Sequence, residues 1–328
     1  MAMVKADIFV RFVDIPSFAP RESAINGPKP PLQKRNFHTD RNFYSRNRAF
    51  GRLAMRILQP AVMETAHWHG HVEINLLRRG RMTYEMDGAP VAIPEGRLIV
   101  FWAGIPHRLT ALAPNGRESP ELCNLYMPLD QFLTLPHLAP LQVALLGGGL
   151  AALPDALHHP DQMERWFTDY RSGGTERLGA MRMEINALLR RGLIDGPEWL
   201  HAPLNDRSDD RSLGAGHVRH VVAMGRHIIE NLTDPMTNAD VTAVTGLNEN
   251  YALAMFSRTM RMPMERFIIR MRLIRARALL VESPFAISSV AEMSSFASLS
   301  QFYKHFRQAY DIAPHAPRTR VGRTSSQA

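Results

Sequence analysis

The chain has 328 residues, of which 45% are hydrophobic and 21% charged, and a formal net charge of +8. That length suffices for two domains with buried cores, and the composition is typical of a globular protein. A single cysteine, Cys123, excludes a disulfide framework and a four-cysteine zinc module, and no apolar run reaches the ~18 residues that span a bilayer. We therefore expect a cytoplasmic protein without a membrane partner.

Charge is distributed unevenly. Residues 1–60 contain 11 Lys and Arg against 4 Asp and Glu, residues 61–215 contain 14 against 19, and residues 216–320 contain 13 against 8. An acidic middle followed by a basic end suits a sensing domain joined to a polyanion-binding domain, although a basic region is also often a solvated face. Residues 1–50 mix prolines with Arg and Asn without periodicity, which predicts a disordered tail.

Residues 51–200 begin with short apolar runs separated by turn signals. Asp87-Gly88 between two of these runs is typical of a tight β-hairpin. Evenly spaced short strands predict a small barrel or sandwich. Two amphipathic helices follow, at about 160–170 and 175–191, and they either cover the barrel or supply a dimer surface.

Histidines and a glutamate recur at strand spacing in this region. Because side chains alternate along a strand, His67, His69 and Glu73 share one face, and His107 follows a later apolar run. With the intervening glycines this pattern resembles the two motifs of the cupin barrel, in which such residues converge on one metal. Three interpretations stay open: a metal site, a set that hydrogen-bonds a small effector, or a buried cluster without a ligand.

Residues 201–216 are polar and rich in Gly, Ser and Asp, which predicts an interdomain linker. Residues 217–320 then contain one helical pattern twice, with an arginine-rich helix between the copies. Each copy predicts a short helix, a tight turn and a longer helix, the arrangement that places one helix in the DNA major groove. The matching apolar positions are Val241, Val244 and Leu247 in the first copy and Val290, Met293 and Phe296 in the second.

The longer helix of each copy carries the predicted base contacts. In the first copy Asn238 is expected to cap the short helix, and Asn248 to begin the longer one, with Tyr251 inside. Asparagine pairs with adenine and glutamate accepts from cytosine, while arginines also bind phosphates. The predicted DNA-binding residues are Asn248, Glu249, Asn250, Arg258, Arg272, Ser298, Ser300, Gln301, Lys304 and Arg307.

These residues resemble the DNA-binding domain of the AraC/XylS family of transcription regulators. The resemblance rests on Gly246 to Ala252, on the helix from Arg272 to Leu280 and on the second copy, and it covers the whole domain. The chain departs from the family pattern at Ser295, where members usually have glycine, and in the segment that follows the second copy. Ser295 must therefore adopt a turn conformation normally given to glycine.

The resemblance implies a transcription regulator that is not an enzyme and has no cofactor. Its partners would be double-stranded DNA, a small effector, a second copy in a homodimer and, if it activates, RNA polymerase. Within the family the chain resembles regulators of α-galactoside use, which implies a sugar effector. Aromatic side chains such as tryptophan can stack on a sugar ring. The predicted effector-binding residues are His67, Trp68, His69, Glu73, Trp102 and His107.

We thus expect an α+β chain: a cupin-like β-barrel with two flanking helices, then an all-α domain of two helix-turn-helix modules joined by a linker helix. Two other classes remain as alternatives. One is a metal-dependent cupin enzyme with a DNA-binding tail, and the other is an architectural DNA-binding protein that needs no effector.

Overall fold

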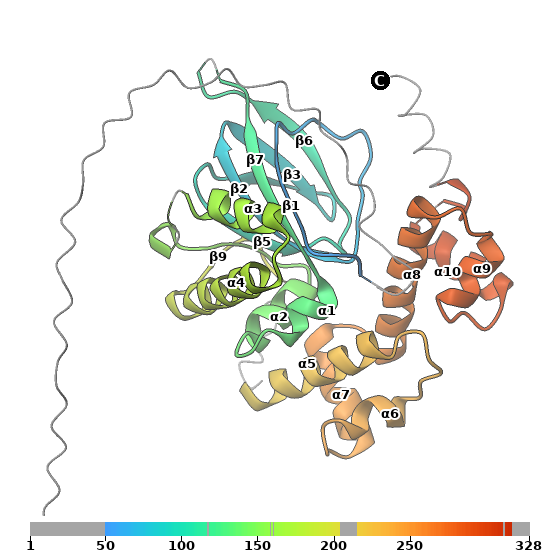
Figure 1. The fold of residues 1–328 in the computed structure, drawn as a ribbon. Helices are drawn as coiled ribbons and strands as arrows, with labels where there is room; N and C mark the ends of the chain where they lie inside the picture. Colours follow the sequence, from blue (N-terminus) through green and yellow to red (C-terminus); the bar gives the residue numbers. More distant parts are fainter. Residues whose placement is uncertain are drawn as a thin grey trace, which may run out of the picture. The chain divides into compact units, whose positions relative to one another are not determined.

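The fold of the chain is described by a computed structural model, in which antiparallel strands come first and helices follow (Figure 1). This order confirms the predicted fold class. Of the predicted tail only residue 50 is described, and of the predicted linker only residues 201–203, 215 and 216. The structure describes residues 50–316 with the exception of 117, 158, 160, 204–214 and 311.

The larger sheet has six strands in the order β1-β7-β2-β5-β8-β9, and each neighbouring pair is antiparallel. Strand β5 is buried at every position, so it lies in the core rather than at a solvated face. The strands are β1 (Ala54–Leu58), β2 (His71–Arg79), β5 (Leu98–Trp102), β7 (Glu121–Pro128), β8 (Leu150–Ala152) and β9 (Glu198–His201).

The smaller sheet has the order β4-β3-β6 and is also antiparallel. It contains β3 (Arg81–Met86), β4 (Ala89–Ile93) and β6 (His107–Ala113). The predicted hairpin joins β3 to β4, and Asp87 and Gly88 both have positive φ, at 49° and 81°, as such a turn requires. Among the described strands, pairing gives two sheets and no closed barrel, where the strand spacing predicts either a small barrel or a sandwich.

Helices α3 (Gln162–Ser172) and α4 (Thr175–Asp195) are the two predicted flanking helices. They pack on each other through Trp166, which is fully buried and donates from Nε1 to Glu184 on α4 at 2.8 Å. Helices α1 (Leu129–Thr134) and α2 (Ala139–Leu146) were not expected from the sequence. In α2, residues 141–146 are all buried, so this helix has no amphipathic period to reveal it.

The C-terminal part contains the two expected helix-turn-helix modules, formed by α6 with α7 and by α9 with α10, and the linker helix α8. Helix α5 packs against α1, α2 and α7, and one continuous cluster of buried apolar side chains includes residues of both parts of the chain. The helices are α5 (Ala215–Glu230), α6 (Asn238–Ala243), α7 (Glu249–Met260), α8 (Met264–Glu282), α9 (Ile287–Met293) and α10 (Leu299–Tyr310).

Two local expectations in the first module were wrong. Thr237, not Asn238, is the N-cap of α6: its hydroxyl accepts from the Asp240 backbone N–H, and the Asp240 carboxylate accepts from the Thr237 backbone N–H. Tyr251 is 44% exposed rather than inside, and its hydroxyl lies 3.0 Å from Nε2 of His217 on α5. Thr237 and Asn238 are both residue types that cap helices, and only the backbone geometry shows which of them is the N-cap of α6.

Across the residues that the structure describes, none of the helices is both long enough and apolar enough to cross a membrane.

Candidate DNA-binding and effector sites

The N-terminus of α7 presents three of the predicted base-contacting residues to solvent. Glu249 and Asn250 are exposed in its first turn. Asn248 is the N-cap, because its Oδ1 accepts from the Tyr251 backbone N–H at 3.4 Å. Asn248 is exposed as well, but its Oδ1 already accepts the hydrogen bond that caps the helix. Arg258 is exposed in the last turn of the same helix.

The second module repeats this arrangement on α10. Phe302 and Phe306 are fully buried, whereas the predicted contact residues stay on the exposed side. Ser298 caps the helix, with its Oγ accepting from the Gln301 backbone N–H at 3.2 Å. The exposed predicted residues of this module are Ser298, Ser300, Gln301, Lys304 and Arg307.

The turn of the second module has the left-handed backbone that its sequence predicted. Ser295 has a φ of 57°, close to the 67° of Gly246 in the first module. Its hydroxyl donates to the backbone carbonyl of Thr233 at 2.6 Å, ahead of the first module. The residue that departs from the family pattern therefore also connects the second module to the segment between α5 and α6.

Most arginines of α8 contact backbone carbonyls of the protein itself. Arg272, a predicted DNA contact, is half-buried and donates to the carbonyls of Leu232 at 3.4 Å and Asp234 at 3.3 Å. Arg275 is buried and donates to Met293 at 3.0 Å. Burial lowers the pKa of both guanidinium groups. Helix α8 thus holds its neighbours in place as well as joining the modules.

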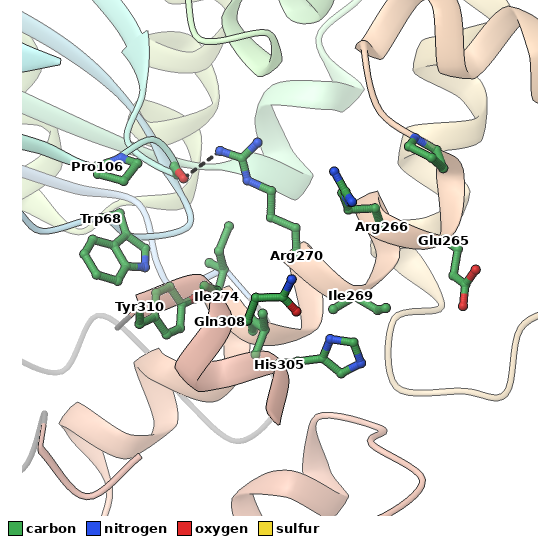
Figure 2. A pocket seen from close by; sticks show the side chains of 14 residues that line it. Trp68, Pro106, Glu265, Arg266, Ile269, Arg270, Ile274, His305, Gln308 and Tyr310 are labelled. Atoms are coloured by element: carbon green, nitrogen blue, oxygen red, sulfur yellow. Dashed lines mark hydrogen bonds between the residues drawn. The ribbon is translucent and has the colours of Figure 1, made fainter. Parts of the chain in front are cut away.

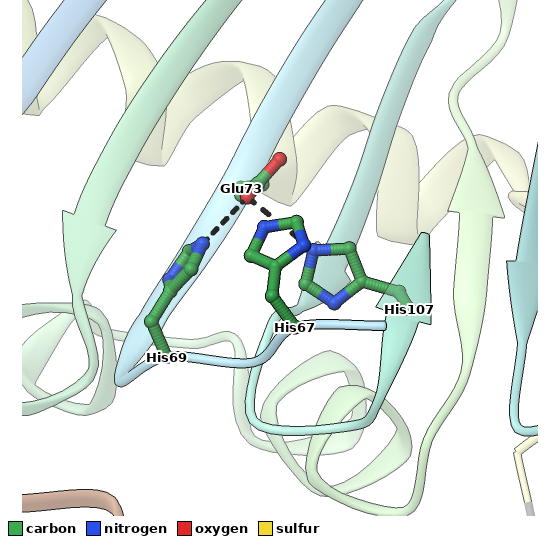
Figure 3. Close-up of side chains that lie close together, drawn as sticks. All are labelled: His67, His69, Glu73 and His107. Carbon is green, nitrogen blue, oxygen red and sulfur yellow. Dashed lines mark ion pairs between the residues drawn. The ribbon is translucent and has the colours of Figure 1, made fainter. Parts of the chain in front are cut away.

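Four of the six predicted effector-binding side chains converge (Figure 3). One ligand atom from each of His67, His69, Glu73 and His107 lies within 4.8 Å of all the others. We call these four residues the polar cluster. Glu73 on β2 is its centre: its Oε1 lies 2.9 Å from Nε2 of His69 and 3.8 Å from Nε2 of His107. The backbones of His67 and His107 pair in an isolated β-bridge, which brings His67 beside the other three residues.

Residues that the sequence analysis did not select surround the polar cluster. Asn75 lies on the Glu73 side of β2 and donates to Glu73 Oε2 at 2.7 Å. His71 Nδ1 lies 3.3 Å from His69 Nδ1, and His71 Nε2 lies 3.1 Å from the carbonyl of Arg52. Strand alternation alone would have placed His71 and Asn75 beside Glu73, because all are separated by two positions.

Burial decides the charge states in the polar cluster. Burial, and then the neighbouring His107, lowers the pKa of His67 and His69 well below the usual histidine range. Burial also lowers the pKa of His107 and brings that of His71 to about 3. The same desolvation raises the pKa of Glu73. The histidines are therefore neutral near pH 7, and each keeps one nitrogen lone pair.

The two predicted tryptophans lie away from the polar cluster, next to α8. The Arg277 guanidinium lies 4.2 Å from the ring of Trp68, and Arg270 lies 4.7 Å from the ring of Trp102. Tyr310 of α10 stacks on Trp68 at 4.6 Å. Both arginines also contact the backbone of this part of the chain: Arg277 donates to the Trp68 carbonyl at 2.5 Å, and Arg270 donates to the Gly104 carbonyl at 3.0 Å.

A cavity of about 580 Å³ opens beside these contacts (Figure 2). Trp68, Gly104 and Pro106 form one side, and residues of α8 and α10 form the other. The sequence does not predict this cavity, because no local pattern shows which residues of distant elements meet. The lining residues from α8 and α10 include Arg266, Ile269, Arg270, Ile274, His305, Gln308 and Tyr310.

Comparisons with known proteins match both halves of this description. Residues 61–167 match the AraC-like ligand-binding domain, and residues 241–320 match a helix-turn-helix domain. The melibiose operon regulatory protein of Escherichia coli strain K12 is 29% identical over 266 residues, which cover 81% of this chain and 87% of that protein. The regulatory protein PocR of Salmonella typhimurium is 31% identical over 100 residues, covering 30% and 33%.

Among solved structures, ToxT of Vibrio cholerae O395 matches with a TM-score of 0.48 and 11% identity, over 82% of this chain and 98% of ToxT. The matching families and curated relatives are transcription regulators rather than enzymes. With a ligand-binding domain before a double helix-turn-helix domain, the chain belongs to the AraC family of transcription regulators.

Proposed function

We propose that this regulator responds to a sugar, such as an α-galactoside, that binds at the polar cluster. One observation carries the proposal: His67, His69, Glu73 and His107 converge in the part of the chain that matches the AraC-like ligand-binding domain. Neutral imidazoles and a carboxyl group offer the donors and acceptors that sugar hydroxyls need. The name of the melibiose regulator, which is similar over most of its length, supports the choice of sugar.

Trp68 and Trp102 complete the proposed effector-binding set. Trp68, between His67 and His69, lines the cavity, as do Gly104 and Pro106 ahead of His107, whereas Trp102 is buried in β5 beside Arg270. Stacking of a sugar ring on Trp68 requires the Tyr310 ring to move. Effector binding would thus change a contact between the sheet part and α10.

Calorimetry of the full chain against melibiose, galactose and unrelated sugars tests this proposal. A variant with His107→Ala should bind the active sugar at least about tenfold more weakly, since one buried partner is lost. His159→Ala is the matched control, because the His159 side chain is 70% exposed outside the cluster. The proposal would be contradicted if none of the sugars gave binding heat, or if the His107→Ala variant bound the active sugar with the affinity of wild type.

For DNA, we propose that α7 and α10 enter successive major-groove segments on one face of the duplex. The exposed residues at the start of each helix would contact base edges, and Arg258, Lys304 and Arg307 the phosphates. Arg272 remains in the proposed set only if it releases the carbonyls of Leu232 and Asp234. Such a regulator acts in the cytoplasm, where bacterial DNA is found.

We further propose a homodimer that pairs through α4. Met183 and Ile194 on this helix are 70% and 67% exposed, and eleven positions between them amount to about three helical turns. Ala187 and the exposed Arg190 lie on the same side of α4, so Met183, Ala187 and Ile194 form an apolar stripe that one cation interrupts. If the regulator activates transcription, RNA polymerase is its further partner.

A further inference from the structure

The longer helices of the two modules begin with the same capping geometry, so their positions can be matched one by one. Asn248 and Ser298 are the N-caps: the side chain of each accepts a backbone N–H from the first turn, at 3.4 Å and 3.2 Å. The first helical residue is therefore Glu249 in α7 and Leu299 in α10. At matched places, one module has a carboxylate and the other has a hydrocarbon side chain.

Leu299 stands outside the core of its own module. It is 44% exposed, whereas Phe302 and Phe306 of the same helix are fully buried. Phe296 and Tyr303 are partly buried and pack on that core. Among the described residues of α9 and α10, Leu299 is the only large apolar residue that is exposed. Its apolar surface is therefore in water in the free protein, and contact with an apolar partner would be favourable.

The exposed residues around Leu299 are polar. The Ser298 hydroxyl caps the helix, and Ser300, Gln301 and Lys304 are exposed on the same helix. These side chains can form hydrogen bonds with base edges or phosphates, and leucine cannot. In the major groove the apolar group that a base edge presents is the C5-methyl group of thymine. The side chain of Leu299 thus matches thymine and none of the other bases.

We propose that Leu299 contacts the methyl group of a thymine and so selects a T·A pair in the half-site that α10 binds. At the matched place of α7, the Glu249 carboxylate can accept from the amino group of cytosine instead. The two half-sites of the DNA target therefore differ in sequence, and the protein binds the target in one orientation. This inference rests on the proposed entry of α7 and α10 into the major groove.

Replacement of thymine by deoxyuridine tests the contact, because deoxyuridine lacks only the C5-methyl group and keeps the base pair. The probe is a duplex selected from random DNA by binding to the full chain, and each of its thymines is replaced in turn. Affinities are measured by fluorescence anisotropy. At one position the affinity of wild type should fall about fourfold, the effect of losing one buried methyl group.

Variants at the two matched places identify the residue that makes the contact. In Leu299→Ala the thymine and deoxyuridine duplexes should bind within about 1.5-fold of each other, because the contact is already lost. Leu299→Met keeps an apolar side chain of similar size and should keep the difference. Glu249→Ala should weaken binding to the selected duplex but also keep the difference. Since Leu299 lies outside the core, circular dichroism should show the wild-type fold in both of its variants.

Dimethyl sulfate protection of the same duplex reports the binding mode independently of Leu299. Guanine N7 lies in the major groove, so two protected segments indicate that both modules enter it. Given this protection, the inference is overturned if no replacement weakens wild-type binding, or if the difference survives in Leu299→Ala. Leu299 would then serve only the helix, for which leucine has a high propensity. Without protection, the proposed binding mode is wrong, and the inference fails with it.

Discussion

Ser295 shows how a single residue can depart from a family pattern and still preserve its geometry. A non-glycine residue in the left-handed region costs about 1 kcal/mol. The hydroxyl of Ser295 donates to the Thr233 carbonyl at 2.6 Å, and such a bond contributes about 1 kcal/mol. The two effects are of equal size and opposite sign, so the turn persists without the glycine.

This balance predicts different outcomes for two substitutions at Ser295. Ser295→Ala keeps the strained backbone and loses the hydrogen bond, so the free energy of unfolding should fall by about 1 kcal/mol. Ser295→Gly loses the bond but relieves the strain, so its stability should stay within about 0.5 kcal/mol of wild type. Urea denaturation measures both. A glycine variant more stable than wild type by over about 1 kcal/mol would mean that the hydrogen bond contributes nothing.

At the start of α7, neighbouring asparagines are expected to have different roles. Asn250 is exposed and unused by the helix cap, so Asn250→Ala should weaken binding to the specific site by about 1–3 kcal/mol and leave binding to random DNA nearly unchanged. Fluorescence anisotropy with both DNAs measures the difference. An equal loss on both DNAs would exclude Asn250 as a base reader.

Asn248→Ser is the matched variant for the cap. Serine keeps the bond to the Tyr251 backbone N–H but cannot pair with adenine through an amide. If capping is the main role of Asn248, the affinity of the Asn248→Ser variant for the specific site stays within about threefold of wild type. That change corresponds to well under 1.4 kcal/mol. A loss as large as that of Asn250→Ala would assign base reading to Asn248 too.

At the scale of elements, periodic patterns predicted most of the fold. The spacing of Val241, Phe256 and Phe302 located the modules, and Asp87-Gly88 located a hairpin, because these signals are local in sequence. Helix α2 escaped prediction because residues 141–146 are buried on every side of the helix, the polar Gln142 included. For α8 the sequence predicted a DNA contact by Arg272 but not its bonds to the carbonyls of Leu232 and Asp234, since no periodicity reveals a carbonyl that a distant segment brings near.

The candidate site was predictable in part for the same reason. Alternation along a strand predicted that His67, His69 and Glu73 lie together and would have included Asn75, although β2 begins only at His71. The separation of Trp68 from its histidine neighbours also follows from alternation. What it contacts does not, because Tyr310 and Arg277 lie more than two hundred positions further along the chain.

The exposed side of α10 is expected to bind the DNA backbone as well as bases. Lys304→Ala should reduce affinity for specific and random DNA alike, and should lower the slope of log affinity against log salt by about one. Titrations from 50 to 200 mM salt, roughly the range in which such slopes are defined, measure this. Arg182→Ala on α4 is the control, being an exposed cation outside the modules. An unchanged slope in the lysine variant would exclude a phosphate contact.

Helix α4 gives a prediction about assembly. Replacing both Met183 and Ile194 with Lys should convert a dimer to a monomer in sedimentation equilibrium, because charges would interrupt the apolar stripe without entering the core. Val62→Lys is the control, since Val62 is 56% exposed and lies outside α4. A dimer that survives the double substitution would place the interface elsewhere.

At the scale of the whole molecule, the contacts of α8 connect effector binding to DNA binding. Arg277 and Arg270 hold the carbonyls of Trp68 and Gly104, and these residues lie close in sequence to the histidines of the polar cluster. A ligand at the cluster therefore acts on the segments that α8 holds. Because α8 joins the two modules, a shift of those segments changes how α7 and α10 are presented to DNA.

Removing these contacts should uncouple the two activities. A double variant with Arg270→Ala and Arg277→Ala should bind the active sugar and random DNA within about threefold of wild type. The factor by which the sugar changes affinity for the specific site should fall from a typical 5- to 150-fold toward one. Arg182→Ala, an exposed arginine of α4 outside the cavity, should keep the wild-type factor. If the double variant keeps that factor as well, coupling passes through α5 and its packing on α1 and α2 instead, because these form the other connection between the sheet part and the modules.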